Sequence, residues 1–411
     1  MTSASVKTRR ILVLGAGPFQ VPLIEKAKAL GCTVYATSNR PGDVGRQLAD
    51  RPLTISILDI PALEALCRKE NIQAIVTGAS DLGSISVARL NECLGLPGLT
   101  RAQVLAVSDK GQFVRLQARL GLPHPQSFEV AEPGDLERVI DGFTAFPAIV
   151  KPFNASGSRG VRVVADIDGL REAHDFVFQQ SFLRKGYLVQ GFLHGIEHGG
   201  ECLVENGHVV FLALTHKFHN SSFVPTGHFV PYEPDTACLD SLKRQIEQLA
   251  EHLKIVNSPL NIDVIFPAEG PPVLIDLSFR LGGNMLPQLM ELQYGVDTVR
   301  RCLDYCLGNP LEPLVPAVAS AGGRGAIILG SPVAGTASVE LFARTQELFE
   351  SSADVIEMKF DVMPGDRVHR FSEGSHRVGH VVFRVNDRAD FERLLLAEQE
   401  ILQRSIHVEE R

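Results

Sequence analysis

The chain has 411 residues, a hydrophobic content of 45% that is typical of a globular protein, and a formal net charge of −8 at pH 7. Its length is enough for two or three domains with sizeable cores, and its negative charge argues against a nucleic-acid partner held mainly by electrostatics. The seven cysteines are scattered without a CxxC pair. They predict neither a disulfide framework nor a zinc site, but thiols in a reducing compartment.

The N-terminal basic residues and the apolar run ILVLGAG briefly resemble a signal peptide. The apolar run is too short for one, and it ends in a glycine-rich turn. No apolar stretch approaches the length of a membrane span. The sequence therefore predicts a cytoplasmic protein that does not interact with membranes.

Residues 10–100 alternate strand-like and helix-like segments. The runs RILVLGA, CTVYATS and IQAIVTGA are each followed by a helical pattern, which predicts an open, doubly wound parallel sheet with helices on its faces. Gly15 and Gly17 in the first turn are compatible with a nicotinamide-dependent reductase. Gln20 stands in the place of the third glycine, however, and no acid follows VYATSN. A tight strand-to-helix turn is the favoured interpretation.

The rest of the chain divides into stretches of different pattern. They are a pair of helices (101–122), a smaller strand-rich unit (123–195), strands around a helix (196–310) and, after the proline-rich segment NPLEPLVPAVAS, shorter strands and a helix at 387–405. Because proline cannot continue regular elements, the proline-rich segment marks a domain boundary.

The stretch AIVKPFNASGSRGVRV (148–163) places a lysine at the mouth of a loop of small residues. Consecutive backbone N–H groups in such a loop can converge on an anion, and Lys151 beside them adds a positive charge. No Gly-Lys-Ser/Thr sequence precedes a helix, so this is not a Walker A loop. The loop joins two strands, which leaves two interpretations: a hairpin flap over phosphates, or a plain surface hairpin.

The strands NIDVIF (261–266) and VLIDLSF (273–279) are joined by a short turn. Centring that turn between Glu269 and Gly270 places Asp263 opposite Asp276 and Asn261 opposite Ser278, with all four on one face. The other face, directed toward a core, then consists of Ile262, Val264, Ile275 and Leu277.

Two like charges directly opposite each other destabilise a sheet unless something compensates. Mg²⁺ is the expected cation, because it binds one or two carboxylates together with substrate phosphates. Arg280 follows on the same face and is a candidate ligand for an acyl-phosphate oxygen. The alternative is a solvated hairpin with two exposed acids.

These elements, taken in order, make the chain resemble the ATP-grasp superfamily of carboxylate–amine ligases over nearly its whole length. The elements are Asp109-Lys110, VKPFNASGSRGV, the hinge segment YLVQGFLHGIE, NIDVIF and IDLSFRLGG. The resemblance implies an α/β ATP-grasp fold. Its expected parts are an N-terminal doubly wound domain (1–100), an ATP-grasp region (101–310) with a flap subdomain (123–190) and a catalytic part (191–310), and a small C-terminal α+β domain (311–411).

The resemblance also implies a role for individual residues. Lys110 and Lys151 would bind the α- and β-phosphates of ATP, and Glu197 would hold the ribose hydroxyls. The phosphates would be covered by Ser156, Gly157, Ser158 and Gly160, and adenine would be lined by Gln190 and Leu193. Asp263 and Asp276 would bind Mg²⁺, with Ser278 as the third ligand. The family usually has Glu, Asn and Glu at positions 276, 278 and 190.

Within the superfamily, the segment THKFHNSSFVPTGHFVP (215–231) resembles the L-amino-acid ligases, which form dipeptides and amide-bearing natural products. His228 matches their pattern, and with Lys151 and Arg280 it makes up the implied catalytic set. Pro225 stands where an acid for an α-ammonium group is common, so an ordinary α-amino acid is not specifically indicated.

The implied reaction is the ATP-dependent activation of a carboxylate as an acyl phosphate. An amine then attacks it to form an amide or peptide bond, with release of ADP and phosphate. The implied cofactors are ATP and two Mg²⁺ ions, for which Mn²⁺ can substitute. The implied partners are small-molecule carboxylates and amines and, as is common in the superfamily, a second copy in a homodimer. Two alternatives remain: a purine-pathway-like enzyme that activates formate or bicarbonate for a ribonucleotide amine, and a non-catalytic ATP-binding regulator.

Overall fold

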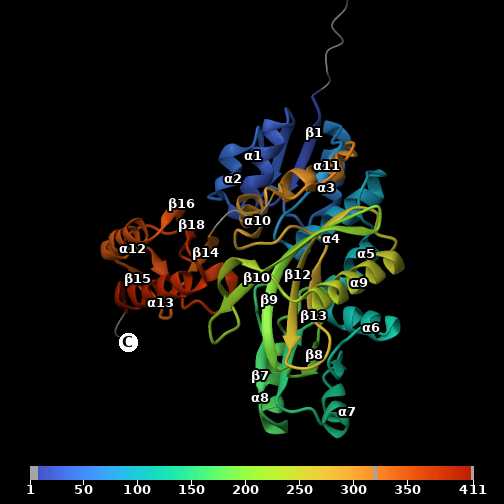
Figure 1. The fold of residues 1–411 in the computed structure, drawn as a ribbon. Helices are drawn as coiled ribbons and strands as arrows, with labels where there is room; N and C mark the ends of the chain where they lie inside the picture. Colours follow the sequence, from blue (N-terminus) through green and yellow to red (C-terminus); the bar gives the residue numbers. More distant parts are fainter. Residues whose placement is uncertain (1–7, 318–321, 409–411) are drawn as a thin grey trace, which may run out of the picture.

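The computed structural model describes residues 8–317 and 322–408. These residues form four sheets. The N-terminal sheet lies at one end of the molecule, the flap subdomain at the other, and the C-terminal part to one side (Figure 1). The last residues of the proline-rich boundary segment (318–320) lie outside the described residues.

The N-terminal unit is the predicted parallel sheet, in the order β3-β2-β1-β4. Its strands are β1 (Arg10–Leu14), β2 (Thr33–Thr37), β3 (Arg51–Leu53) and β4 (Ala74–Val76), with helices η1 (Pro18–Gln20), α1 (Val21–Ala29), α2 (Val44–Leu48), α3 (Ile60–Glu70) and α4 (Asp81–Leu94). Ile11 and Val13 of β1 pack into one core, while Leu12 and Leu14 pack into another. Both faces of the sheet are therefore covered, as a doubly wound sheet requires.

The turn after β1 is filled by the side chain of Gln20. Its Oε1 accepts a hydrogen bond of 3.0 Å from the Gly17 amide, and its Nε2 donates to the Gly78 carbonyl. A Cβ atom added at Gly15, where φ is +94°, would lie 3.1 Å from the Gln20 side chain. The space that a dinucleotide phosphate would need is therefore occupied, which favours the tight-turn interpretation.

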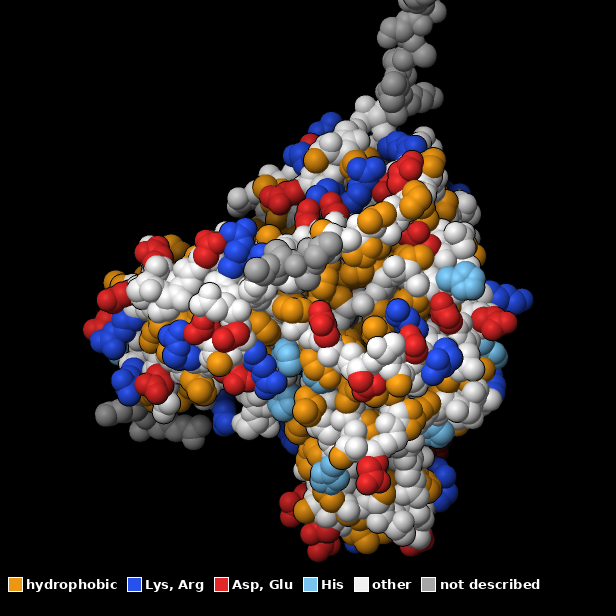
Figure 2. All heavy atoms as spheres, viewed as in Figure 1, with side chains coloured by type: hydrophobic (Ala, Val, Ile, Leu, Met, Phe, Trp, Pro, Cys, Tyr) orange, Lys and Arg blue, Asp and Glu red, His pale blue; other side chains and the backbone are white. Residues whose placement is uncertain are grey.

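The flap subdomain is a separate antiparallel sheet in the order β5-β8-β6-β7. It follows the predicted helix pair, α5 (Arg101–Ser108) and α6 (Lys110–Leu120). Its elements are β5 (Ser127–Val130), α7 (Asp135–Gly142), β6 (Ala148–Pro152), β7 (Arg162–Val164), α8 (Ile167–Phe178) and β8 (Tyr187–Gly191). A core of its own lies between the sheet and the two helices, and the subdomain projects from the body of the molecule (Figure 2).

The central feature is an eight-stranded sheet in the order β13-β12-β9-β10-β11-β14-β18-β16. Its strands are β9 (Gly195–Glu205), β10 (His208–His219), β11 (Pro225–Tyr232), β12 (Ser258–Pro267), β13 (Val273–Ser278), β14 (Gly323–Leu329), β16 (Asp354–Phe360) and β18 (Gly379–Val385). The predicted helix, α9 (Thr236–Leu253), packs against β10. Because β11 pairs with β14, the sheet runs through the proposed boundary at residue 310. The division into 1–100, 101–310 and 311–411 stays a proposal.

Two helices near that boundary connect the units. They are α10 (Leu286–Tyr294) and α11 (Thr298–Leu307). Val299, Cys302 and Leu303 of α11 belong to the same core as β1, and the backbone of Leu281 bridges to Gly78. The N-terminal sheet is thereby fixed against the residues that directly follow the predicted carboxylate hairpin.

The C-terminal part contains one helix more than the sequence analysis expected. α12 (Val339–Ser352) packs against the predicted helix, α13 (Arg388–Arg404). The short strands β15 (Gly335–Ala337), β17 (Arg367–Val368) and β19 (Ile406–His407) form a small sheet, and η2 (Gly374–His376) precedes β18. None of the described helices is both long and apolar enough to cross a membrane.

Candidate active site

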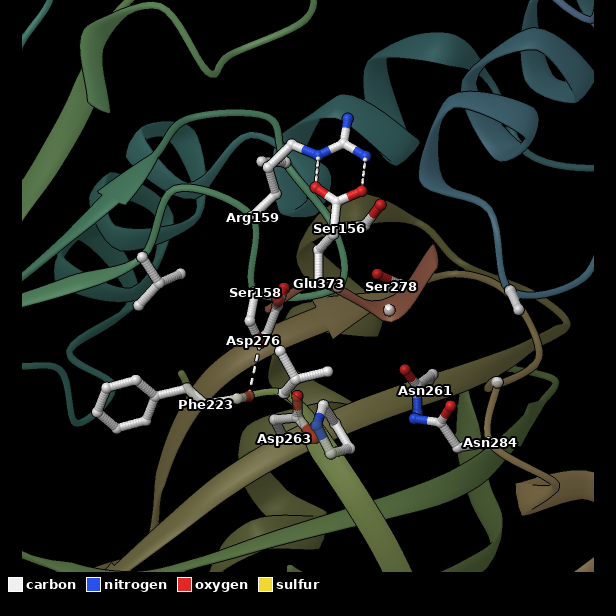
Figure 3. A pocket seen from close by; sticks show the side chains of 18 of the residues that line it. Ser156, Ser158, Arg159, Phe223, Asn261, Asp263, Asp276, Ser278, Asn284 and Glu373 are labelled. Atoms are coloured by element: carbon white, nitrogen blue, oxygen red, sulfur yellow. Dashed lines mark hydrogen bonds and ion pairs between the residues drawn. The ribbon is translucent and has the colours of Figure 1, made fainter. Parts of the chain in front are cut away.

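A cavity of about 410 Å³ lies where the flap loop, the β12–β13 hairpin, the N-terminal turn and a C-terminal loop meet. Most of the predicted site residues line it, although they come from distant parts of the sequence (Figure 3). The predicted residues in its wall are Lys110, Lys151, Ser156, Gly157, Ser158, Glu197, His228, Asp263, Asp276, Ser278 and Arg280.

The hairpin has the predicted register at the acids. Asp263 pairs with Asp276 and Asn261 with Ser278, and all four side chains contribute to the cavity wall. A bulge between Asp263 and Val264 then shifts the pairing, so that Leu274 lies opposite Val264. Leu274 is consequently the buried residue, and Ile275 lines the cavity. The prediction that Ile275 points to the core is therefore wrong, because a bulge reverses the alternation beyond it.

The two aspartates are each balanced by a lysine. Lys110 Nζ lies 3.0 Å from Asp276 Oδ2. Lys217 Nζ lies 2.8 Å from Asp263 Oδ1 and 2.6 Å from Glu197 Oε1. Burial opposes the charge on Lys217, but the two carboxylates outweigh it and raise the Lys217 pKa, while burial raises the pKa of Asp263. The acids thus face a cavity rather than solvent, which argues against the solvated-hairpin interpretation.

The facing carboxylates suit a hard divalent cation. Within residues 8–317 and 322–408, no group of three or more His, Cys, Asp or Glu side chains is arranged to hold a metal ion. A cation at Asp263 and Asp276 would therefore need further oxygen ligands from outside the chain. Mg²⁺ is bound in this way, through one or two carboxylates, water and substrate phosphates. The residues present fit Mg²⁺ together with a phosphate-bearing ligand.

Lys151 differs from the other cavity lysines because it has no acidic partner. Its side chain is buried, with 9% of the residue exposed, and none of the ion pairs among the described residues includes it. Burial, and next the charge of Lys110, lower its pKa. A buried cation without a counterion is unfavourable, so this position is suited to an anion brought by a ligand.

Asp109 of the Asp109-Lys110 motif fastens the base of the flap. Its carboxylate caps α6 by accepting from the Gln112 amide at 3.0 Å, and it forms an ion pair of 3.0 Å with Arg184. The amide of Lys110 donates to the Phe153 carbonyl at 3.0 Å. Asp109 therefore fixes the backbone that aims Lys110 into the cavity.

Ser278 and Arg280 share an acid that the sequence analysis missed. Ser278 Oγ donates to Asp81 Oδ1 at 3.0 Å, and Arg280 Nε lies 2.7 Å from the same oxygen. Asp81 is half-buried, and desolvation would raise its pKa, but Arg280, helped by Lys110 and Ser278, outweighs desolvation and lowers it. In the sequence, Asp81 has the pattern of an ordinary acid in the first turn of a helix, and nothing there indicates its partner nearly two hundred residues away.

His228 lies in the cavity wall as a neutral imidazole. Burial, and next the charge of Lys217, lower its pKa to about 3. Its Nδ1 is 2.8 Å from Thr215 Oγ1, which fixes the ring. At neutral pH the ring therefore carries no positive charge toward the cavity.

Three predicted nucleotide-binding residues lie outside this cavity wall. Gln190 is buried in the flap sheet, where its Nε2 donates to Ser127 Oγ at 2.9 Å. Leu193 follows β8, and Gly160 (φ +74°) is crowded by Gln180 and Pro152. Their roles toward the nucleotide stay predictions.

Beyond Asp81, the sequence analysis missed two contributors to the cavity. Successive side chains of β10 point to opposite faces of the sheet. An argument from this alternation could have placed Lys217 on the same sheet face as Glu197. The C-terminal loop contributes Phe371, Glu373, Gly374 and Ser375, and no pattern in the sequence marks it.

The match of residues 144–288 to the ATP-grasp domain family covers the flap loop and the carboxylate hairpin. The chain contains an ATP-grasp domain. The matching stretch includes Lys151, Asp263, Asp276 and Arg280, which the cavity brings together.

The curated relatives of this chain include formate-dependent phosphoribosylglycinamide formyltransferases. The one from Mannheimia succiniciproducens is 24% identical over 230 residues, covering 55% of this chain and 56% of the relative. The one from Dechloromonas aromatica is 28% identical over 196 residues, covering 47% and 49%. The chain thus matches about half the length of these relatives.

Solved structures resemble the chain over almost its full length. The L-amino acid ligase from Bacillus licheniformis has a TM-score of 0.81 at 17% identity, covering 98% of this chain and 99% of that one. Phosphoribosylglycinamide synthetase from Anaerococcus prevotii has a TM-score of 0.72 at 20% identity, covering 98% and 100%. The biotin carboxylase domain dimer of Hydrogenobacter thermophilus 2-oxoglutarate carboxylase, a complex with MgADP, ADP and bicarbonate, has a TM-score of 0.74 at 16% identity, covering 94% and 88%. The α/β ATP-grasp fold therefore extends over the chain.

Proposed function

We propose that this ATP-grasp chain is an ADP-forming ligase that uses ATP and Mg²⁺ to join a carboxylate to an amine. The observation that carries the proposal is Lys151, a buried lysine beneath a glycine-serine loop that takes part in no ion pair among the described residues. In the wall of the same cavity, Asp263 and Asp276 face each other. This combination suits the phosphate end of a nucleotide and its metal.

In the proposed reaction, a carboxylate oxygen attacks the γ-phosphorus of ATP, and ADP leaves. The amine nitrogen then attacks the acyl-phosphate carbon, phosphate leaves, and the amine loses a proton. Lys151 and Arg280 would neutralise charge on the transferring group. Mg²⁺, held by Asp263 and Asp276, would supply further neutralisation of the phosphate oxygens. Lys110 and Lys217, which now balance those carboxylates, would be free to contact the ligand.

Neutral His228 would line the part of the cavity that receives the carboxylate substrate, as an uncharged hydrogen-bonding group. Because its pKa is lowered to about 3, it is not protonated at neutral pH. We expect it to orient the substrate rather than to attract a carboxylate.

A purine-pathway-like activity is the second candidate, supported by the curated relatives whose names state formate dependence. The L-amino-acid-ligase-like activity, and with it natural product biosynthesis, is supported by the TM-score of 0.81 to that ligase. Homodimer formation is also proposed, since one structural neighbour is a dimer.

A substrate screen distinguishes the candidates. The purified chain is incubated with ATP and Mg²⁺ and with formate, bicarbonate or a panel of amino and other organic acids, each with and without phosphoribosylglycinamide or simple amines. ADP formation and product mass are recorded. ADP that depends on one acid–amine pair supports ligation and names its class. Nucleotide binding without ADP under every pair would instead support the non-catalytic regulator.

A further inference from the structure

The C-terminal loop, residues 371–376, reaches across the cavity to the flap loop, residues 154–160. Its main contact is an ion pair with two parallel bonds: Arg159 Nε and Nη2 donate to the two oxygens of Glu373, each at 2.9 Å (Figure 3). The two side chains are 34% and 22% exposed. Paired bonds between a guanidinium and a carboxylate are stronger and more directional than a single surface ion pair.

The Glu373 carboxylate is held in position from its own side. Ser375 Oγ donates to Glu373 Oε1, and His376 Nε2 lies 3.7 Å from the same oxygen. Arg159 is also supported, because its guanidinium lies over the Phe182 ring, 5.1 Å from the centroid. Each partner is therefore also held by a neighbour of its own, which reduces the entropy cost of the pair.

Two neighbouring residues of the flap loop are held as well. Ser158 Oγ donates to the Phe223 carbonyl at 2.6 Å, and the Gly374 amide donates to the Gly157 carbonyl at 3.4 Å. A Cβ atom at Gly157 would lie 3.3 Å from the Gly374 nitrogen, so the two backbones approach closely. Three consecutive flap residues thus contact segments outside the flap subdomain.

The flap loop has little internal structure to hold this position. Residues 154–161 contain no helix or strand, and Gly157, Ser158 and Gly160 adopt left-handed φ angles of +66°, +61° and +74°. For Ser158 this conformation is uncommon and needs support from its surroundings. The support comes from the contacts with the C-terminal loop and with Phe223.

We infer that Glu373 is a positioning residue, which clamps the flap loop closed through Arg159. Closing the flap over the phosphate side of the cavity would then also fix the position of the C-terminal loop that forms part of the cavity wall. Phe371 and Ser375 of the same loop line the cavity, so the ion pair joins the flap loop to a part of the cavity wall. The consequence for catalysis rests on the proposed function. A closed flap would keep water from the acyl phosphate until the amine has reacted.

Hydrogen exchange of the intact chain, measured by mass spectrometry without any substrate, tests the clamp directly. Glu373→Gln keeps the shape of the side chain but removes its charge. We expect exchange in residues 154–160 and 371–376 to become about two- to fivefold faster, as for the loss of a partly exposed ion pair. Glu137→Gln is the matched control, because Glu137 forms an exposed ion pair of 3.0 Å with Arg171 in the same subdomain; it should leave both segments unchanged.

A charge exchange separates the pair from a general loss of structure. Arg159→Glu or Glu373→Arg alone places like charges together and should accelerate exchange in both segments. The double variant, Arg159→Glu with Glu373→Arg, should restore most of the protection. Unchanged exchange in Glu373→Gln, an equal effect of Glu137→Gln, or a double variant no better than the single ones would overturn the clamp.

An activity measurement then tests the consequence. With an acid–amine pair that the chain accepts, Glu373→Gln should raise the ADP formed per amide, because water reaches the intermediate, and should raise KM for ATP more than it lowers kcat. An unchanged ADP-to-amide ratio would refute the shielding role. If the unmodified chain forms no ADP with any pair, the proposed function fails, whereas the exchange measurement still decides whether the clamp exists.

Discussion

The substitution Lys217→Met tests the electrostatics of the cavity most directly. Lys217 is the shared counterion of Glu197 and Asp263, at 2.6 Å and 2.8 Å, and only 6% of its side chain is exposed. Methionine fills a similar volume but leaves two partly buried carboxylates without a cation. Removing one partner of a buried ion pair typically costs about 3–5 kcal/mol.

The expected change can be expressed as a melting temperature. With an unfolding entropy of about 2.1 cal/mol/K per residue, the 411 residues carry about 0.9 kcal/mol/K. A loss of about 3 kcal/mol then lowers Tm by about 3 °C if the chain unfolds as one unit, and by about twice that if half of it does. Differential scanning calorimetry measures this shift. The control is Lys69→Met at an exposed position of α3, which should leave Tm unchanged.

The pH dependence of that shift has a definite sign. In the unmodified chain Lys217 lowers the pKa of Glu197 despite burial, so the pair stabilises the fold above the ordinary carboxylate pKa and is lost on acidification. In Lys217→Met the pKa of Glu197 should instead be raised, and that of Asp263, which burial already raises, should rise further. The resulting penalty grows as pH rises. The Tm difference should be large at pH 8 and small at pH 4, and excess Mg²⁺ should restore part of it at pH 8. A loss below 1 °C at pH 8, or one that does not vary with pH, would refute this account of the site.

Three further outcomes are expected. Lys151→Ala and Asp276→Asn should each reduce ADP formation at least about 100-fold while keeping a folded chain by circular dichroism; near-normal turnover in either would contradict the site assignment. MgADP at about 100 times its Kd should stabilise the unmodified chain by about 2.7 kcal/mol, seen as a Tm increase of about 3 °C that Lys151→Ala loses; an equal increase in the variant would place the phosphates elsewhere. Burial raises the pKa of Glu398 from 4.5 to about 8, with Thr345 Oγ1 donating to it at 2.9 Å, so stability should fall as pH rises from 4.5 toward 8. Glu398→Gln should flatten this dependence of Tm on pH, and an unchanged slope would contradict the assignment.

The local register of the carboxylate hairpin could be predicted because strand side chains alternate with a period of two and a short turn fixes which residues pair. Asp263 therefore lies opposite Asp276 as expected. The same rule failed at Ile275, next to Asp276, because a bulge shifts the β12–β13 pairing there and no pattern in the residues of β13 marks it.

The sequence by itself determined the parts of the site that lie on one hairpin or one loop: Lys151 at the mouth of the flap loop and the facing aspartates. It also determined the alternating pattern of the N-terminal sheet. Only the tertiary structure decided which distant charges meet them. Lys217 reaches Asp263 of β12 from β10, across the intervening β9, Asp81 reaches Arg280 from the N-terminal unit, and Glu373 reaches Arg159 from the C-terminal loop. Alternation along a strand can indicate the face on which a side chain lies, but it does not name the distant partner. Coulomb attraction depends on distance in space, and the order of residues along the chain does not set that distance.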